Sequence, residues 1–336
     1  MNPDRRRFLR QAAATAAGTG LVAAGMGAQP AAADNPFPNP LPFQTPSNPR
    51  ISEWVLRKSF DKEAVWTNEY QGMCTDGVYW YIVTNKDQGG QQRLYKTTLD
   101  FSVVASIQAP NPSDHIGSPT YDARRGLVYI PLEPYESGEG PTGLSGASRI
   151  WQVAPTAGNI HTVASVPLTN KEGTDWGPQG GRAPWFAWHP WDGLVYSSTA
   201  GNADNGLHVW SFNGYDPVTG RLKKQMILDG VYHDFQGAGF GRDGRNIYVV
   251  SDHGFVSDGK KRIYAFDMTN PSDGKTSRCW GARVNPSTAE AEGIVHAHLA
   301  WNDAPNTDIT VGMLSNQVDS DNVEFYHFSV PDPEAI

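Results

Sequence analysis

Arg93-Leu94-Tyr95-Lys96-Thr97 is the first of five copies of a short aromatic strand. The copies begin at residues 93, 149, 207, 262 and 323, so successive copies are 56, 58, 55 and 61 residues apart. Self-similarity at a nearly constant period indicates a repeat architecture. The later copies are Arg149-Ile150-Trp151-Gln152-Val153, Leu207-His208-Val209-Trp210-Ser211-Phe212, Arg262-Ile263-Tyr264-Ala265-Phe266 and Val323-Glu324-Phe325-Tyr326-His327-Phe328.

A tight turn followed by another strand precedes each copy. Asp and Gly tolerate the backbone angles of hairpin turns, so Asp-Gly between two apolar runs predicts a hairpin. A fourth strand follows in most units, as at Val103–Ile107 and Thr162–Val166. Four antiparallel strands in each repeat are typical of a propeller blade. The turns are Asp76-Gly77, Asp122–Gly126, Asp192-Gly193, Asp243-Gly244 and the degenerate Asn302-Asp303.

The two ends of the repeat region predict how the ring closes. The last unit ends soon after Val330 and lacks a fourth strand, whereas Glu53–Phe60 is a spare strand before the first unit. We expect the spare strand to complete the last blade and so remove an open edge. The predicted fold is all-β, a single five-bladed β-propeller of four-stranded antiparallel blades over residues 51–331, with a tail at 332–336. Six blades remain an alternative if Gln108–Arg149 or Leu168–Leu207 hides another blade.

Composition narrows the possible partners and cross-links. Apolar residues make up 39% of the chain, aromatic residues 11%, and the formal net charge is −8 without a basic stripe. This charge pattern argues against nucleic acid as a partner. No apolar run in the repeat region suits a membrane span. The two cysteines, Cys74 and Cys279, fall on strands of different predicted blades. We expect two buried thiols rather than a disulfide.

The first residues have the layout of an export signal. A basic segment, Arg5-Arg6-Arg7-Phe8-Leu9-Arg10, precedes a small apolar run and the cleavage-type segment Ala31-Ala32-Ala33. This segment resembles the twin-arginine (Tat) signal family, with Asp4 and Arg10 as mild departures. The resemblance implies a leader over 1–33, the Tat translocase as a partner during export, and a secreted or periplasmic location. Residues 34–50 are rich in Pro and Asn and predict an extended linker.

Candidate site residues open the innermost strand of each blade, where a propeller has its central channel. Most of these strands begin with a polar residue close to a glycine. One interpretation is structural, since glycine suits a crowded axis and a polar residue can satisfy exposed backbone. The other is a ligand-binding ring of Gln71, His115, Gln236 and Glu292. The five openings are Gln71-Gly72, His115-Ile116-Gly117, Arg182-Ala183-Pro184-Trp185, Gln236-Gly237 and Glu292-Gly293.

Histidines and tryptophans add further candidates near these openings. His115, His233 and His296 could act as a general base near neutral pH. Glu292, His296 and His298 could bind a divalent metal, calcium or zinc, if that segment is extended. Aromatic rings stack on the apolar faces of sugars, and Trp176 and Trp185 are candidates for such contacts.

Three functions remain open from the sequence. The Gly-polar openings and the Asp-Gly turns resemble exported propeller proteins broadly, including phytase-like, lactonase-like and lectin-like members, and the resemblance implies fold rather than activity. We expect recognition of an extracellular small molecule or glycan, such as a carbohydrate or cell-envelope glycan, at the channel mouth. The alternative is a secreted hydrolase or lyase with a His/Glu site, with or without a metal. The third is an interaction scaffold.

Overall fold

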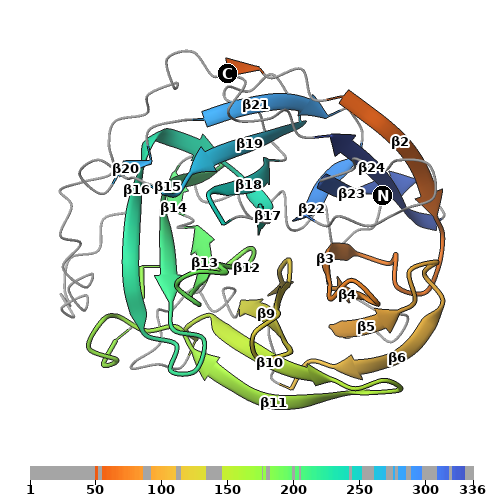
Figure 1. Ribbon diagram of the computed structural model, residues 1–336, viewed down its shortest axis with the longest axis horizontal. Coiled ribbons are helices and arrows are strands. Elements are labelled where there is room, and N and C mark those ends of the chain that lie inside the picture. Colours follow the sequence, from red (N-terminus) through yellow and green to blue (C-terminus); the bar gives the residue numbers. More distant parts are fainter. Residues whose placement is uncertain are drawn as a thin grey trace, which may run out of the picture.

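The computed structural model describes residues 50–51, 55–85, 92–110, 115–133, 146–175, 177–178, 182–198, 201–203, 206–241, 244–251, 261–269, 275–276, 279–284, 289–296, 309–317 and 320–329. Its strands form five sheets that stand around a common axis, like the blades of a propeller (Figure 1). The predicted all-β, five-bladed fold is therefore confirmed. Within these residues, no helix is long and apolar enough to cross a membrane.

Blades 1 and 2 each run outward from the axis in chain order. Blade 1 consists of β3 (Tyr70–Thr75), β4 (Trp80–Thr84), β5 (Arg93–Thr97) and β6 (Val103–Gln108). The innermost strand of blade 2 is interrupted, so two short strands, β7 (His115–Ile116) and β8 (Thr120–Asp122), pair with β9. Blade 2 then continues outward through β9 (Leu127–Glu133), β10 (Arg149–Pro155) and β11 (Ile160–Pro167).

Blades 3 and 4 carry additional strands that the repeat pattern did not predict. Blade 3 consists of β12 (Ala187–Trp188), β13 (Val195–Ser198), β15 (Gly206–Tyr215) and β16 (Leu222–His233), with β14 (Gly201–Ala203) paired to β15 and β20 (Lys275–Thr276) parallel to β16. Blade 4 consists of β17 (Phe235–Phe240), β18 (Asn246–Ser251), β19 (Lys261–Asp267) and β21 (Cys279–Val284). A short strand, β1 (Arg50–Ile51), pairs in parallel with β21, so the predicted linker ends inside this sheet.

Blade 5 closes the ring in the way the sequence predicts. It is built from β22 (Glu290–His296), β23 (Ile309–Gln317), β24 (Ser320–Ser329) and the N-terminal strand β2 (Val55–Lys62). β2 pairs antiparallel with β24 from Val55 opposite Ser329 to Lys62 opposite Val323. The six-blade alternative is wrong, because the stretches between residues 108 and 149 and between 168 and 207 supply inner strands of blades 2 and 3.

The turns at Asp76, Asp122 and Asp192, in blades 1 to 3, lock their hairpins with the same pair of contacts. Gly77 and Gly193 adopt φ values of 89° and 72°, which glycine reaches without a Cβ penalty. The turn aspartate accepts backbone N–H groups through one oxygen and a tyrosine hydroxyl of the following strand through the other. The three tyrosine hydroxyl–aspartate Oδ2 distances are 2.7 Å for Tyr81–Asp76, 2.9 Å for Tyr129–Asp122 and 2.8 Å for Tyr196–Asp192.

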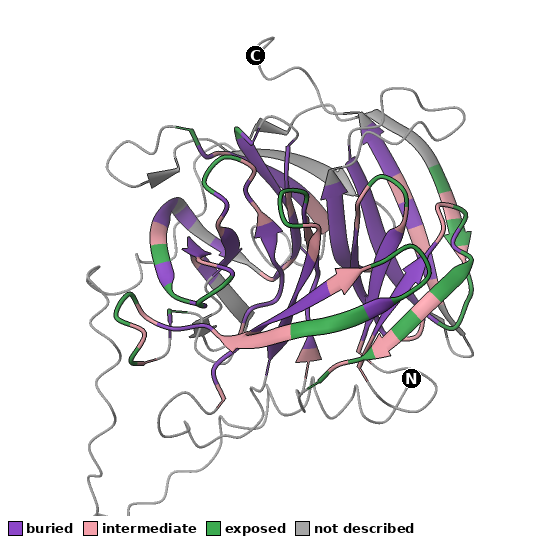
Figure 2. Ribbon diagram, turned by 60° about the horizontal axis from the view of Figure 1, so that its bottom comes forward, coloured by how far each residue is buried: buried purple, intermediate pink, exposed green. Residues whose placement is uncertain are grey.

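The hydrophobic core lies between the blades. Large aromatic side chains fill the spaces between neighbouring sheets, and most residues of the inner strands are buried (Figure 2). Trp80 stacks on Phe101 with ring centroids 5.9 Å apart, and Phe101 in turn contacts Phe325 of blade 5 at 4.9 Å. Cys74 is a buried free thiol, as predicted, while Cys279 lies on β21 in another blade.

Candidate functional site

The predicted polar residues gather at one end of the ring. In each blade the start of the innermost strand pairs with the end of the second strand, away from the hairpin turn. Tyr70 pairs with Thr84, and His115 with Glu133. Gln71, His115, Gln236 and Glu292 therefore lie at the end opposite the Asp-Gly turns. We call this end the mouth.

Three of these residues lie at β-bulges. Gln71, Gln236 and Glu292 are the extra residues at register shifts in β3, β17 and β22, each followed by glycine. A β-bulge leaves one residue out of the ladder and re-aims its side chain. Glu69 and Asp234 have positive φ values of 52° and 44°, an uncommon conformation for residues other than glycine. The repeated bulge explains why a polar residue can recur at the inner edge without disturbing the core.

The glycines after these residues are required by close contact between blades. A Cβ built on Gly237 would lie 2.7 Å from Gly293 Cα, and one on Gly293 would lie 2.7 Å from Gly72 Cα. Gly72 in turn packs against Ser118, and Gly117 packs against the carbonyl of Pro184. The innermost strands thus touch through their backbones around the axis. This confirms the structural interpretation of the glycines and leaves the polar residues to be explained.

His115 is held between two partners from different strands. Its Nδ1 lies 2.7 Å from Oε2 of Glu133, and its Nε2 contacts Oε1 of Gln71. The Gln71 amide is oriented by donating to the carbonyl of Tyr70 at 3.0 Å. Both ring nitrogens therefore face oxygen atoms of neighbouring side chains. The other oxygen of Glu133 accepts the backbone N–H of Ala183 from blade 3.

The three residues of this network differ in their exposure to solvent. The Glu133 side chain is almost fully enclosed, with 6% relative exposure, and Gln71 is buried, while the His115 side chain remains 18% exposed. A buried carboxylate that orients a partly exposed imidazole is the arrangement that fixes the ring in one position. His115 is thus the member of the network that a ligand in the mouth can reach.

A second buried carboxylate lies in the mouth at blade 5. Glu292 has 3% relative exposure. Burial, together with the charge of Glu292, raises the pKa of Tyr70 well above its usual value, so the phenol stays neutral. The Tyr70 hydroxyl packs against the backbone of Gly293 and Gly312, so Tyr70 connects blade 1 to blade 5. The mouth therefore combines a His–Glu pair on one side with a buried glutamate on the other.

The predicted metal ligands, Glu292, His296 and His298, are only partly described by the structure. His296 follows Glu292 by four residues and ends β22 beside the hairpin turn. Residues at this separation in a strand have Cα atoms about 13 Å apart. His298 and the side chain of His296 lie outside the described residues. Among the residues that are described, no group of three His, Cys, Asp or Glu side chains could hold a metal ion.

The remaining candidates divide between the mouth, the core and the undescribed part of the chain. Gln236 is partly exposed at the mouth. Trp185 has no exposed surface and packs edge-on against Phe212 at 5.7 Å, so we leave it out of the site. Trp176 lies outside the described residues, as does the side chain of His233 at the end of β16.

Glu133 is the functional candidate that sequence reasoning missed. It ends an otherwise uncharged strand, Leu127–Glu133, and antiparallel pairing places the last residue of a second strand beside the first residue of the innermost one. A charged residue at that position was the available signal.

The chain was compared with family models, with curated proteins and with solved structures. No family model matches the chain, and no curated protein matches it. Solved structures with partial similarity include hydrazine synthase of Kuenenia stuttgartiensis (10% identity, TM-score 0.41, 74% of this chain and 57% of that chain). They also include the tail fiber of Staphylococcus aureus phage P68 (12%, 0.44, 80% and 52%) and TolB from Acinetobacter baumannii (14%, 0.35, 71% and 49%). The chain spans roughly half the length of each of these three chains.

Proposed function

We propose that the protein binds a hydroxyl-rich ligand, a carbohydrate or cell-envelope glycan, at the mouth. The observation that carries this proposal is the His115–Glu133–Gln71 network. Imidazole, amide and carboxylate groups together offer both donors and acceptors, which suits hydroxyl groups that both donate and accept hydrogen bonds. The net charge of −8 and the two buried glutamates favour a neutral ligand over a polyanion.

The asymmetry of the mouth favours one ligand in one orientation. Equivalent positions carry Gln71 in blade 1, Gln236 in blade 4 and Glu292 in blade 5, whereas blade 2 contributes His115. A lectin with one equivalent site in each blade would repeat the same residues. We therefore propose a single site on the axis, in which different side chains from different blades bind the ligand.

A second candidate is a hydrolase or lyase at the same mouth. The specific observation is the His115–Glu133 pair, because a histidine oriented by a buried carboxylate can transfer protons. A general base also needs a free nitrogen within reach of its substrate. Nε2 of His115 faces Gln71, so catalysis would require Gln71 to move aside. Ligand binding needs no free His115 nitrogen, because a ligand can pack against the exposed part of the ring, and we rank it first.

We propose that this binding takes place outside the cytoplasm. The support is the Tat-like leader, whose Arg5-Arg6 pair precedes Phe8 and Leu9. Replacing both arginines with lysine in the full chain should retain the precursor in the cytoplasm. Cell fractionation measures where the variant is found. Normal export of the variant would contradict the Tat route.

The binding proposal is tested with a glycan array followed by calorimetric titration of the best ligand. H115A should lose binding, because it removes the reachable member of the network. H189A is a matched control: His189 also pairs with a carboxylate, Asp192 at 2.9 Å, but at the hairpin-turn end of blade 3. Equal binding by the wild type and H115A would overturn the proposed site. Absence of any array ligand, with turnover of a glycoside or ester substrate instead, would favour the enzyme.

A further inference from the structure

Three blades begin with the same four-residue pattern at the mouth. In blades 1, 4 and 5 an acidic residue stands three positions before the glycine that touches the neighbouring blade, and Gln or Glu directly precedes that glycine. Blades 2 and 3 do not have this pattern. The three tetrads are Glu69-Tyr70-Gln71-Gly72, Asp234-Phe235-Gln236-Gly237 and Glu290-Ala291-Glu292-Gly293.

The three tetrads lie side by side around the axis. β17, β22 and β3 follow one another at the centre of the ring (Figure 1). The glycines of the tetrads touch in the order Gly237, Gly293 and Gly72. The tetrads therefore form one continuous arc on one side of the mouth, which we call the acidic arc. Blades 2 and 3 contribute His115 and Arg182 to the other side.

The acidic arc gives the mouth an excess of negative charge. Two of its carboxylates are buried, Glu292 with 3% and Glu69 with 8% relative exposure. Glu133 adds a further carboxylate on the facing side. Among the described residues that open the five innermost strands, Arg182 is the one Lys or Arg. The carboxylates of the arc are those of Glu69, Asp234, Glu290 and Glu292.

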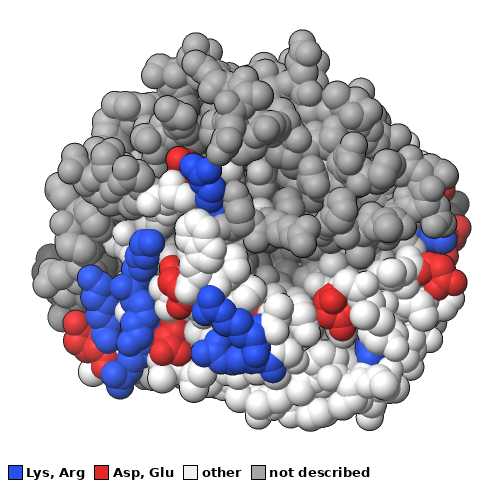
Figure 3. Space-filling model, in the orientation of Figure 1, with Lys and Arg blue, Asp and Glu red and all other residues white. Residues whose placement is uncertain are grey.

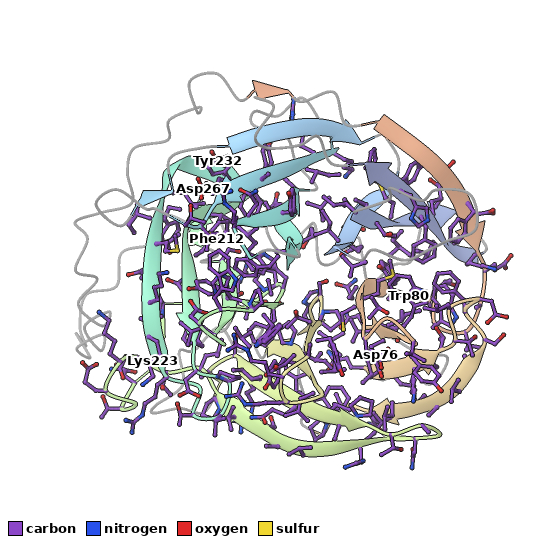
Figure 4. All side chains as sticks on the ribbon, in the orientation of Figure 1. Asp76, Trp80, Phe212, Lys223, Tyr232 and Asp267 are labelled. Carbon is purple, nitrogen blue, oxygen red and sulfur yellow. The ribbon has the colours of Figure 1, made fainter. Side chains whose placement is uncertain are left out.

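Positively charged side chains gather on the outside of the ring instead. Lys223 and Lys224 lie on β16, an outer strand of blade 3. Figure 4 labels Lys223 at the lower left, and Figure 3 shows a group of Lys and Arg side chains there. A cleft lined by charges of one sign attracts ligands of the opposite sign. The distribution of charge therefore favours a cationic group in the mouth.

Two buried hydroxyl groups lie against the glycines of the acidic arc. In the described part of the chain, the hydroxyls of Ser118 and Tyr70 have no hydrogen-bond partner, and both side chains are fully buried. The Ser118 hydroxyl points at Gly72, and the Tyr70 hydroxyl lies against Gly293. A buried polar atom without a partner is uncommon and requires an explanation. Hydroxyls, carboxylates and amide oxygens are all acceptors for the three N–H donors of an ammonium group.

We propose that the ligand of the mouth carries a protonated amino group, which binds at the acidic arc. This inference rests on the proposed function and narrows it from hydroxyl-rich ligands to amino sugars and glycans that have a free amine. The hydroxyl groups of the ligand then face His115, on the other side of the mouth. An acetylated amine lacks the positive charge and two of the three N–H donors, so it loses the interaction with the arc.

The test uses three oligosaccharides with the same backbone: the β-1,4-linked tetramers of glucosamine, N-acetylglucosamine and glucose. Calorimetric titration at low salt, with the amine protonated, should show the glucosamine tetramer binding about tenfold or more tightly than the other two. Added salt should reduce this preference by screening. Equal binding of all three tetramers would overturn the inference. If H115A then abolished that equal binding, the proposed function would stand and this inference alone would fail.

A double variant locates the amine. D234N/E290Q removes two charges from partly exposed positions, and Asn tolerates the positive φ of 44° at residue 234. Its preference for glucosamine over N-acetylglucosamine should fall about threefold or more. E172Q is the matched control, because it removes an exposed carboxylate outside the arc and should keep the full preference. An unchanged preference in a D234N/E290Q variant with native near-ultraviolet circular dichroism would overturn the arc as the amine site.

Discussion

Glu133 binds His115 through one carboxylate oxygen, at 2.7 Å, and the backbone N–H of Ala183 through the other. His115 in turn contacts Gln71 of blade 1. One buried carboxylate therefore connects blade 2 to both of its neighbours at the mouth. Site and scaffold are coupled here, because the groups that orient His115 also hold the innermost strands in place.

E133Q tests this double role. The amide has nearly the same shape but lacks the negative charge and one acceptor oxygen, so binding should weaken about tenfold or more and unfolding free energy should fall by about 1–3 kcal/mol. Calorimetric titration and urea denaturation measure the two effects. E172Q, at an exposed position between β11 and β12, should change neither quantity. A fully stable E133Q variant would show that Glu133 has no structural role.

The Tyr–Asp pairs of the hairpin turns should each contribute a similar amount to stability. Y81F, Y129F and Y196F each remove one hydroxyl that donates to a turn aspartate, so a carboxylate that is buried at Asp122 and more exposed at Asp76 and Asp192 loses one partner. Each should lower the unfolding free energy by about 1 kcal/mol. Y121F is the control, since that ring stacks on Tyr81 at 6.2 Å without a turn-aspartate bond. Equal stability of all four variants would rule out the role assigned to these bonds.

The same tyrosines predict a loss of stability in alkali. Burial, reinforced by the hydrogen bonds to Asp76 and Asp192, raises the pKa of Tyr81 and Tyr196 above their usual value. The unfolded value is about 10, so the contribution of these groups is complete below pH ~10 and is lost as the pH rises further. Y81F/Y196F should show a shallower fall in unfolding free energy above this pH. An unchanged pH slope would contradict the assignment.

The contact between blades at Gly293 predicts a sharp effect from one methyl group. G293A places a Cβ 2.7 Å from Gly72 Cα, where only backbone could yield, and should destabilise the fold by about 1–3 kcal/mol. G158A is the control, because a Cβ there would meet nothing within 4 Å. Thermal unfolding compares the two. A neutral G293A would mean that the innermost strands can separate at little cost.

The repeat, the turns and the closing strand could be predicted from the sequence because each depends on local chemistry. Asp-Gly at a turn and an aromatic strand at a fixed period need no knowledge of distant residues. The glycines at the start of the innermost strands could also be predicted from the sequence. The Gln71–His115 contact joins residues 44 positions apart, and Glu133 lies 18 positions from His115. Such contacts depend on strand register and bulges, which the sequence pattern alone does not specify.

Trp185 was predicted as a ligand contact, but the structure buries it. Tryptophan is common both in ligand sites and between packed sheets, and its position beside an opening favoured the first interpretation. The structure places it in the core, beside Phe212.

The most direct test of the mouth as ligand site is nuclear magnetic resonance of the histidine rings during titration with the best glycan. The account predicts that the ring signals of His115 shift until the site is saturated, while those of His189, paired to Asp192 at the other end of the ring, stay unchanged. Saturable binding that leaves the His115 signals in place would show that the ligand lies elsewhere and would contradict the proposed site.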